Sequence, residues 1–162
     1  MEWTREGLEG DGFSGFVRFG DLLGAEVPAV PGVYAVVRQP VGEPEFLLSS
    51  SGGRFKGEDP SVSRERLDAE WVPGSEVVYI GKASGGATGR RGLRKRLDEF
   101  RRFGHGEPVG HKGGRLIWQL EESDTLLVCW KETAVEPALV ESAMLRKFTT
   151  EFGRLPFANL RN

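Results

Sequence analysis

Two charged side chains occupy helix positions that are normally apolar. Glu141, in a predicted helix over residues 137–152, falls in the middle of the apolar stripe when each residue turns the helix by about 100°. Arg96, in a predicted helix over residues 93–103, falls between two phenylalanines by the same rotation. Burying an unpaired charge is costly, so each of these side chains requires a partner.

Two arrangements satisfy these charges. In the first, Arg96 and Glu141 form a structural ion pair, or Arg96 extends past the phenylalanines to solvent. In the second, both side chains line a pocket at the edge of a sheet, where the carboxylate holds a divalent cation and the guanidinium holds a phosphate. The second arrangement predicts a site for a phosphate-bearing ligand.

Basic side chains are concentrated in one segment of the chain. The 162 residues include 22 Lys and Arg against 24 Asp and Glu, a formal charge of −2. Residues 1–77 carry a net charge of −7, residues 82–115 carry +7, and residues 116–162 carry −2. This asymmetry indicates a surface for a phosphate backbone, although a solvated basic helix beside an acidic half would give the same counts. The side chains expected to contact nucleic acid are Arg90, Arg91, Arg94, Lys95, Arg101, His111 and Lys112.

Composition predicts one cytoplasmic domain over residues 1–162. The single cysteine excludes a disulfide framework and a thiolate zinc cage. No apolar run approaches the roughly 20 residues of a membrane-spanning helix, and the first residues lack the basic and apolar regions of a secretion signal. We therefore expect no membrane partner.

The order of predicted elements is β, β, short α, β, α, β, β, α, which indicates an α/β or α+β fold around a small sheet. The final helix has a proline near its first turn and a glycine just past its end, as helices commonly do. The expected elements are strands over 33–38, 45–48 and 77–81, a short helix within 60–70, a helix over 93–103, a hairpin of 115–120 with 125–131, and a helix over 137–152.

Five short segments, in this order, resemble the GIY-YIG nuclease superfamily. They are Gly32-Val33-Tyr34, Tyr79-Ile80-Gly81-Lys82-Ala83, Leu93-Arg94-Lys95-Arg96-Leu97, Val140-Glu141 and Pro156-Phe157-Ala158-Asn159. The resemblance covers residues 31–162 and implies a small mixed, mostly antiparallel sheet flanked by helices. It leaves an N-terminal extension before the matched region and an insertion at about 40–75, between the two tyrosine motifs.

The resemblance implies a metal-dependent endonuclease that hydrolyses phosphodiester bonds in DNA, with RNA as an alternative substrate. Glu141 would be the sole protein ligand of a Mg²⁺ ion, for which Mn²⁺ can substitute, and water and phosphate oxygens would complete the coordination. Arg96 would neutralise the charge that develops on the phosphoryl group. The enzyme is expected to act as a monomer or a homodimer.

Four further residues receive roles from the same resemblance. Tyr34 would orient or deprotonate the attacking water, with Tyr79 and Lys82 as hydrogen-bonding support. A phenol is a poor base at neutral pH, so Lys82 or the metal would have to lower the pKa of Tyr34. Asn159 would tie the end of the chain to the site.

Phe100 departs from the family pattern, in which a tyrosine or histidine often stands one turn after the helix arginine. Phenylalanine neither transfers a proton nor binds a phosphate, so this auxiliary role is lost or passes to His105 or His111. The departure, together with the acidic N-terminal half, leaves an alternative function open: a catalytically inactive module that binds nucleic acid or another partner.

Overall fold

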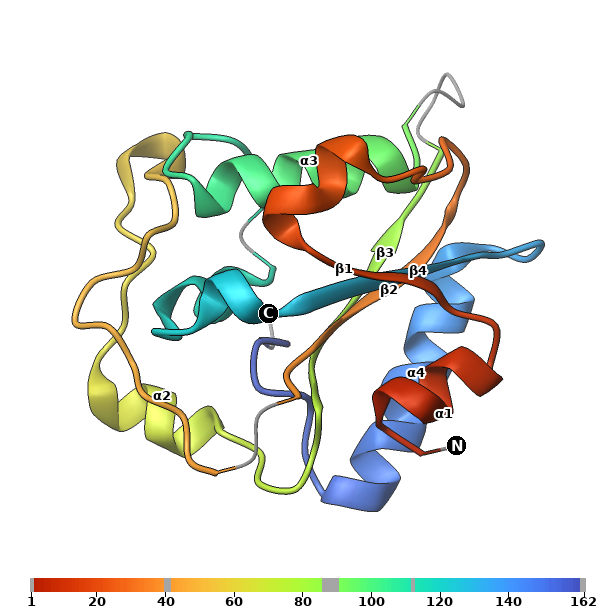
Figure 1. The fold of residues 1–162 in the computed structure, drawn as a ribbon. Helices are drawn as coiled ribbons and strands as arrows, with labels where there is room; N and C mark the ends of the chain where they lie inside the picture. The colour runs from red at the N-terminus through yellow and green to blue at the C-terminus, as the bar shows by residue number, and fades with distance from the viewer. Residues whose placement is uncertain (1, 40–41, 86–90, 112, 161–162) are drawn as a thin grey trace.

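The chain forms an α+β fold around a single four-stranded sheet (Figure 1). The computed structural model describes residues 2–39, 42–85, 91–111 and 113–160. The strands are β1 (Ser14–Arg18), β2 (Gly32–Val37), β3 (Val77–Ala83) and β4 (Leu127–Glu132). They lie in the order β1-β4-β2-β3, and all three pairings are antiparallel, so the sheet in the described residues is not the mixed one that was expected.

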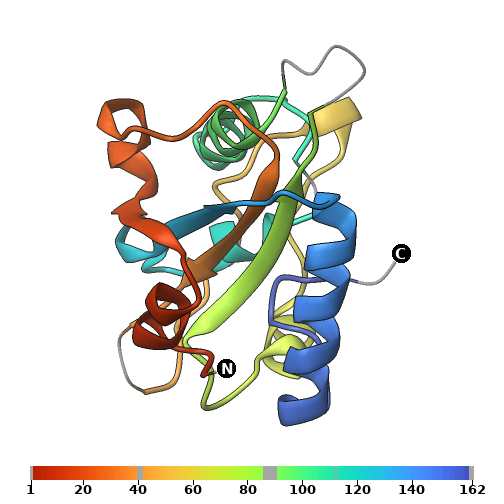
Figure 2. The ribbon, with the colours of Figure 1, turned by 90° about the vertical axis from the view of Figure 1, so that its right-hand side faces the viewer.

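Helices cover both faces of the sheet (Figures 1 and 2). One face packs against α3 (Leu93–Gly104) and the 3-10 helix η1 (Phe19–Gly24), and the other against α1 (Arg5–Gly10) and α4 (Pro137–Phe152). Every residue of the central strand β2 is therefore buried. Its side chains alternate between the two cores, with Tyr34 in the core beside α3 and Val33 in the core beside α4.

Local sequence explains where the two site-bearing helices begin and end. Pro137 lies in the first turn of α4, and Gly153 ends the helix in the left-handed conformation at φ 76°. At the start of α3, two backbone N–H groups donate to carbonyls of the segment that precedes β2. The N–H of Leu93 donates to the carbonyl of Val30 at 2.9 Å, and the N–H of Arg94 donates to the carbonyl of Pro28 at 3.1 Å. These bonds fix the first turn of α3 and with it the position of the arginine that follows.

Three predicted strands and three predicted helices are confirmed: β2, β3, β4, α2 (Arg64–Glu70), α3 and α4. The predicted hairpin of 115–120 with 125–131 is wrong, because Arg115–Gln119 forms a 3-10 helix, η3, and β4 pairs with β1 and β2. The segment carries Leu116, Ile117 and Trp118 into the core beside α3, and a short apolar run does not distinguish a strand from a buried helical turn.

The N-terminal segment is part of the sheet rather than an extension of it. Strand β1 forms one edge by pairing with β4, and α1 is capped by Thr4, whose side chain accepts from the N–H of Gly7 at 3.0 Å. The register of β1 shifts between Gly15 and Val17. This irregularity disrupts the alternation of apolar and polar residues by which strands are recognised in a sequence.

The segment between β2 and β3 packs on the body of the domain, and the two strands pair directly. The predicted strand over 45–48 is reduced to one bridge, between Phe46 and Leu120. The buried amide of Gln119 holds this segment by donating to the carbonyls of Leu47 and Val62, at 3.0 and 2.9 Å, and by accepting from the N–H of Val62 at 3.0 Å. Across the described ranges, no helix has the length and apolar character needed to cross a membrane.

Candidate active site

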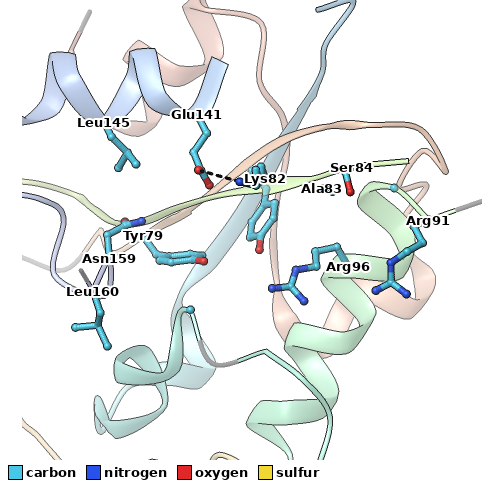
Figure 3. Close-up of a pocket in the computed structure, with 13 residues that line it drawn as sticks. Tyr79, Lys82, Ala83, Ser84, Arg91, Arg96, Glu141, Leu145, Asn159 and Leu160 are labelled. Carbon is cyan, nitrogen blue, oxygen red and sulfur yellow. Dashed lines mark ion pairs between the residues drawn. The ribbon is translucent and has the colours of Figure 1, made fainter. Parts of the chain in front are cut away.

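A cleft of about 890 Å³ opens at the edge strand β3, between α3 on one face of the sheet and α4 on the other (Figure 3). Helix α4 brings the carboxylate of Glu141 to it from one layer, and α3 brings the guanidinium group of Arg96 from the other. The six residues predicted to be catalytic all line it: Tyr34, Tyr79, Lys82, Arg96, Glu141 and Asn159. Residues far apart in the sequence therefore share one cavity.

Glu141 and Arg96 share this cleft without forming the ion pair that was one of the two expectations. The Glu141 carboxylate, 19% exposed, lies 3.9 Å from the ammonium group of Lys82, which is 48% exposed. Arg96 pairs with Glu99 at 3.7 Å, and its Nη1 donates to the backbone carbonyl of Gly110 at 3.0 Å. Burial raises the pKa of Glu141, while Lys82 and Arg96 act in the opposite direction.

The donor set fits a magnesium ion only when the substrate supplies most of its ligands. Glu141 is the one carboxylate in the lining, and the described residues include no group of three or more His, Cys, Asp or Glu able to hold a metal. Mg²⁺ typically takes one or two protein carboxylates and completes its shell with water and phosphate oxygens. Glu141 satisfies this requirement once Lys82 moves away from the carboxylate.

Both tyrosines of the cleft are protonated phenols at neutral pH. Burial, and secondarily Tyr79, raises the pKa of Tyr34 well above its ordinary value, and Arg96 offsets this only in part. Burial also raises the pKa of Tyr79 to about 12. Neither Lys82 nor Arg96 therefore makes Tyr34 a tyrosinate, and its hydroxyl can both donate and accept a hydrogen bond.

Gly81 lies beneath the ring of Tyr34. The two residues face each other in the register of β2 and β3, and a methyl group at position 81 would overlap the phenol ring and its hydroxyl. Gly113 lies similarly close to Tyr79: a Cβ atom added at Gly113 would lie 2.9 Å from the Tyr79 hydroxyl. A close approach of the chain to an aromatic ring explains why glycine follows Tyr79-Ile80 in the sequence.

Gly81→Ala is expected to lower the free energy of unfolding by about 1–3 kcal/mol and to displace Tyr34, because the added methyl group overpacks the strand pair. Urea denaturation measures the loss of stability. Gly10→Ala is the matched control, since nothing lies within 4 Å of the place of its Cβ atom. A Gly81→Ala protein as stable as the wild type would contradict this account of the glycine.

The Asn159 side chain is hydrogen-bonded to the backbone of β3. Its side chain accepts from the N–H of Ile80 at 2.9 Å and donates to the carbonyl of Ile80 at 2.8 Å, and the N–H of Ala158 donates to Val78 at 2.8 Å. The C-terminal segment thus covers the edge of the sheet beside the cleft. This geometry gives Asn159 the role of a positioning residue rather than a phosphate ligand.

His111 is not a surface contact for nucleic acid, because it is completely buried. Its ring stacks on Phe100 with 3.8 Å between centroids and 8° between planes, and its Nε2 lies 2.9 Å from the hydroxyl of Tyr34. Sequence reasoning proposed His111 for the auxiliary role that Phe100 lacks, but nothing in its glycine-rich surroundings predicted a direct bond to Tyr34. His105, the other candidate, lies exposed at the end of α3.

The basic side chains divide by position. Arg91, just before α3, lines the cleft and is 44% exposed, and Arg94 and Lys95 are exposed on the first turn of α3. Arg101 is only 15% exposed and pairs with Asp98 at 2.8 Å, so its guanidinium is largely unavailable to a phosphate. Two predicted contacts, Arg90 and Lys112, lie outside the described residues.

Comparisons with known proteins assign no family to this chain. No protein-family model, no curated protein and no solved structure matches it.

Proposed function

We propose that the protein is a metal-dependent endonuclease that hydrolyses phosphodiester bonds in DNA. The observation that carries the proposal is the convergence of a carboxylate, a guanidinium and a phenol on one cleft from three separate elements. Each group has a use in phosphodiester hydrolysis: a hard oxygen ligand for a divalent cation, a fixed positive charge for the phosphoryl group, and a hydroxyl to orient water.

The roles follow from the positions of these side chains. A phosphate in the cleft would lie between Glu141 on α4 and Arg96 on α3, with exposed Arg91 at the rim. Magnesium, when bound, supplies polarisation of the phosphate and stabilisation of the leaving oxygen. Arg96 supplies charge that water does not screen fully, because its side chain is 29% exposed. Lys82, released from Glu141, is free to contact the phosphate.

The test is cleavage of a supercoiled plasmid by purified protein in MgCl₂ or MnCl₂, with EDTA as the metal-free control and an RNA of matched length as a second substrate. The proposal predicts nicked or linear product from DNA that depends on the metal. Salt-sensitive binding of DNA without cleavage under either metal would contradict it and favour the catalytically inactive binding module.

The exposed basic residues of α3 are expected to contribute to DNA affinity through phosphate contacts. Replacing Arg94 and Lys95 with alanine should weaken binding about equally for all DNA sequences, and should reduce the slope of log K against log salt by about 0.9 for each lost contact. Fluorescence anisotropy over a salt series measures the slope. Alanine at Arg146 and Lys147, exposed on α4 away from the cleft lining, is the matched control and should leave the slope unchanged. An equal change in both double variants would contradict the assignment.

A further inference from the structure

A buried hydrogen bond joins the cleft to an imidazole that does not line it. The hydroxyl of Tyr34 lies 2.9 Å from Nε2 of His111, and both side chains are almost completely buried. Tyr34 lines the cleft, whereas His111 lies behind it. The phenol is therefore placed to pass a proton between water in the cleft and a group that solvent does not reach.

The imidazole is held rigidly in this position. Its ring lies flat on Phe100, and its backbone N–H donates to the carbonyl of Val109 at 3.0 Å. Arg96 fixes the preceding residue by donating to the carbonyl of Gly110 at 3.0 Å. Gly114 packs closely against the tip of the Phe100 ring, where an added Cβ atom would lie 2.5 Å from Cζ. A fixed ring keeps the acceptor at hydrogen-bond distance, as proton transfer requires.

The 2.9 Å contact accommodates a hydrogen bond in either direction, depending on which imidazole nitrogen carries the proton. Burial and the charge of Arg96 hold the pKa of His111 well below its ordinary value, so the ring is neutral and has one donor and one acceptor nitrogen. Arg96 can only donate, and with Tyr79 it is a hydrogen-bonding neighbour of the Tyr34 hydroxyl. Proton transfer from the phenol requires the Tyr34 hydrogen to point to Nε2 and the imidazole proton to reside on Nδ1, a buried atom with no hydrogen-bond partner among the described residues.

We propose that His111 is the proton acceptor of the site and that it acts through Tyr34. This inference rests on the proposed hydrolysis of phosphodiester bonds. As the attacking water loses a proton to the Tyr34 oxygen, the phenol proton passes to Nε2 of His111. The water oxygen forms the new bond to phosphorus, and the ester oxygen leaves with the electron pair of the broken bond and takes a proton from solvent in the open cleft. His111 then returns its proton along the same path, so the net reaction consumes one water.

Proton acceptance by His111 would make the cleavage rate less dependent on pH. The titratable and charged groups that act on the Tyr34–His111 pair are Tyr79 on β3 and Arg96 on α3, and Glu141 on α4 acts on Tyr79. His111 is neutral at neutral pH, so Nε2 can accept a proton without prior titration. Burial and the charge of Arg96 oppose its protonation, and the negative charge of a bound phosphate must offset them. Without His111, the phenol must lose its proton to hydroxide, and the rate must rise with pH.

His111→Phe is the decisive variant, because a phenyl ring preserves the stacking on Phe100 and removes the acceptor. The single-turnover cleavage rate is measured between about pH 6 and pH 9. At pH 7 the variant should be roughly 100-fold slower than the wild type, and its slope of log rate against pH should be greater by about one. His105→Phe changes the other of the two histidines, exposed at the end of α3, and should behave as wild type. An unchanged rate, or a slower rate with the wild-type slope, would overturn the proposal, since a purely structural role does not alter the slope.

Nitrogen-15 NMR of the two histidines tests the hydrogen bond without requiring cleavage. The expected result is a neutral His111 protonated on Nδ1, whose Nε2 resonance shifts in Tyr34→Phe. A proton on Nε2 would overturn the proposal. Wild-type protein that binds DNA but cleaves none contradicts the proposed function, and the NMR result still decides whether His111 is built to accept a proton from Tyr34.

Discussion

Glu141→Gln is expected to lower the rate of metal-dependent cleavage by about 1,000-fold. The substitution keeps the size and shape of the side chain and removes the negative charge of Glu141, the one carboxylate among the described residues that line the cleft. Stabilisation by a bound metal is worth several kcal/mol, and about 4 kcal/mol corresponds to this loss of rate. Single-turnover cleavage of a plasmid over a MgCl₂ series is the measurement.

The fold should tolerate this substitution. Glu141 is partly exposed, and its ion pair with Lys82 is 3.9 Å long with the lysine half exposed. Such pairs contribute at most about 1 kcal/mol, so the melting temperature should change little. Glu151→Gln, an exposed carboxylate on the last turn of the same helix, is the matched control and should retain full activity. Cleavage that survives in Glu141→Gln would rule out the carboxylate as the metal ligand.

Arg96→Ala is expected to lower the cleavage rate by about 100- to 1,000-fold, the usual cost of removing a donor that stabilises charge in a transition state. Arg96→Lys should recover only part of the rate, because an ammonium group lacks the planar fork that binds two phosphate oxygens. Alanine also removes the bond from Nη1 to Gly110 that holds the loop of His111. Single-turnover rates and DNA affinity measured together separate the two effects of the substitution.

The control for Arg96 is Arg102→Ala. Arg102 lies on the same helix, pairs with Glu107 at 3.0 Å, and does not line the cleft. We expect its rate of cleavage to equal that of the wild type. If Arg96→Ala weakens DNA binding and leaves the rate on saturating DNA unchanged, Arg96 binds the ground state only, and its role in the transition state is excluded.

The helices that carry the site could be predicted because their sequences repeat at the helical period. The stripes of α3 and α4 are apolar enough that Arg96 and Glu141 stand out as exceptions. Placing both side chains in one cleft required only that the helices flank an edge of the sheet. The precise partners were not predictable from the sequence: the carboxylate of Glu141 lies beside Lys82, and Arg96 lies beside Glu99.

Other features depend on contacts that no local pattern records. The Tyr34–His111 bond joins residues 77 positions apart, and the flat platform of Phe100 that holds the imidazole is evident only in three dimensions. The 3-10 helix at Arg115–Gln119 is specified by the core that it enters rather than by propensity. Strand β1 escaped prediction because its register shift disrupts the alternation of side chains.

The most direct test of the proposed site is the position of a divalent cation in a complex with DNA. Crystals of the protein with Mn²⁺ and a DNA whose scissile phosphate resists hydrolysis would locate the ion by anomalous scattering. The predicted result is one ion bound by the Glu141 carboxylate and a phosphate oxygen at about 2.1 Å, with Lys82 displaced from its present 3.9 Å contact and Arg96 on the same phosphate. DNA bound with its phosphates away from Glu141, or an ion held elsewhere on the protein, would contradict the assignment of the cleft.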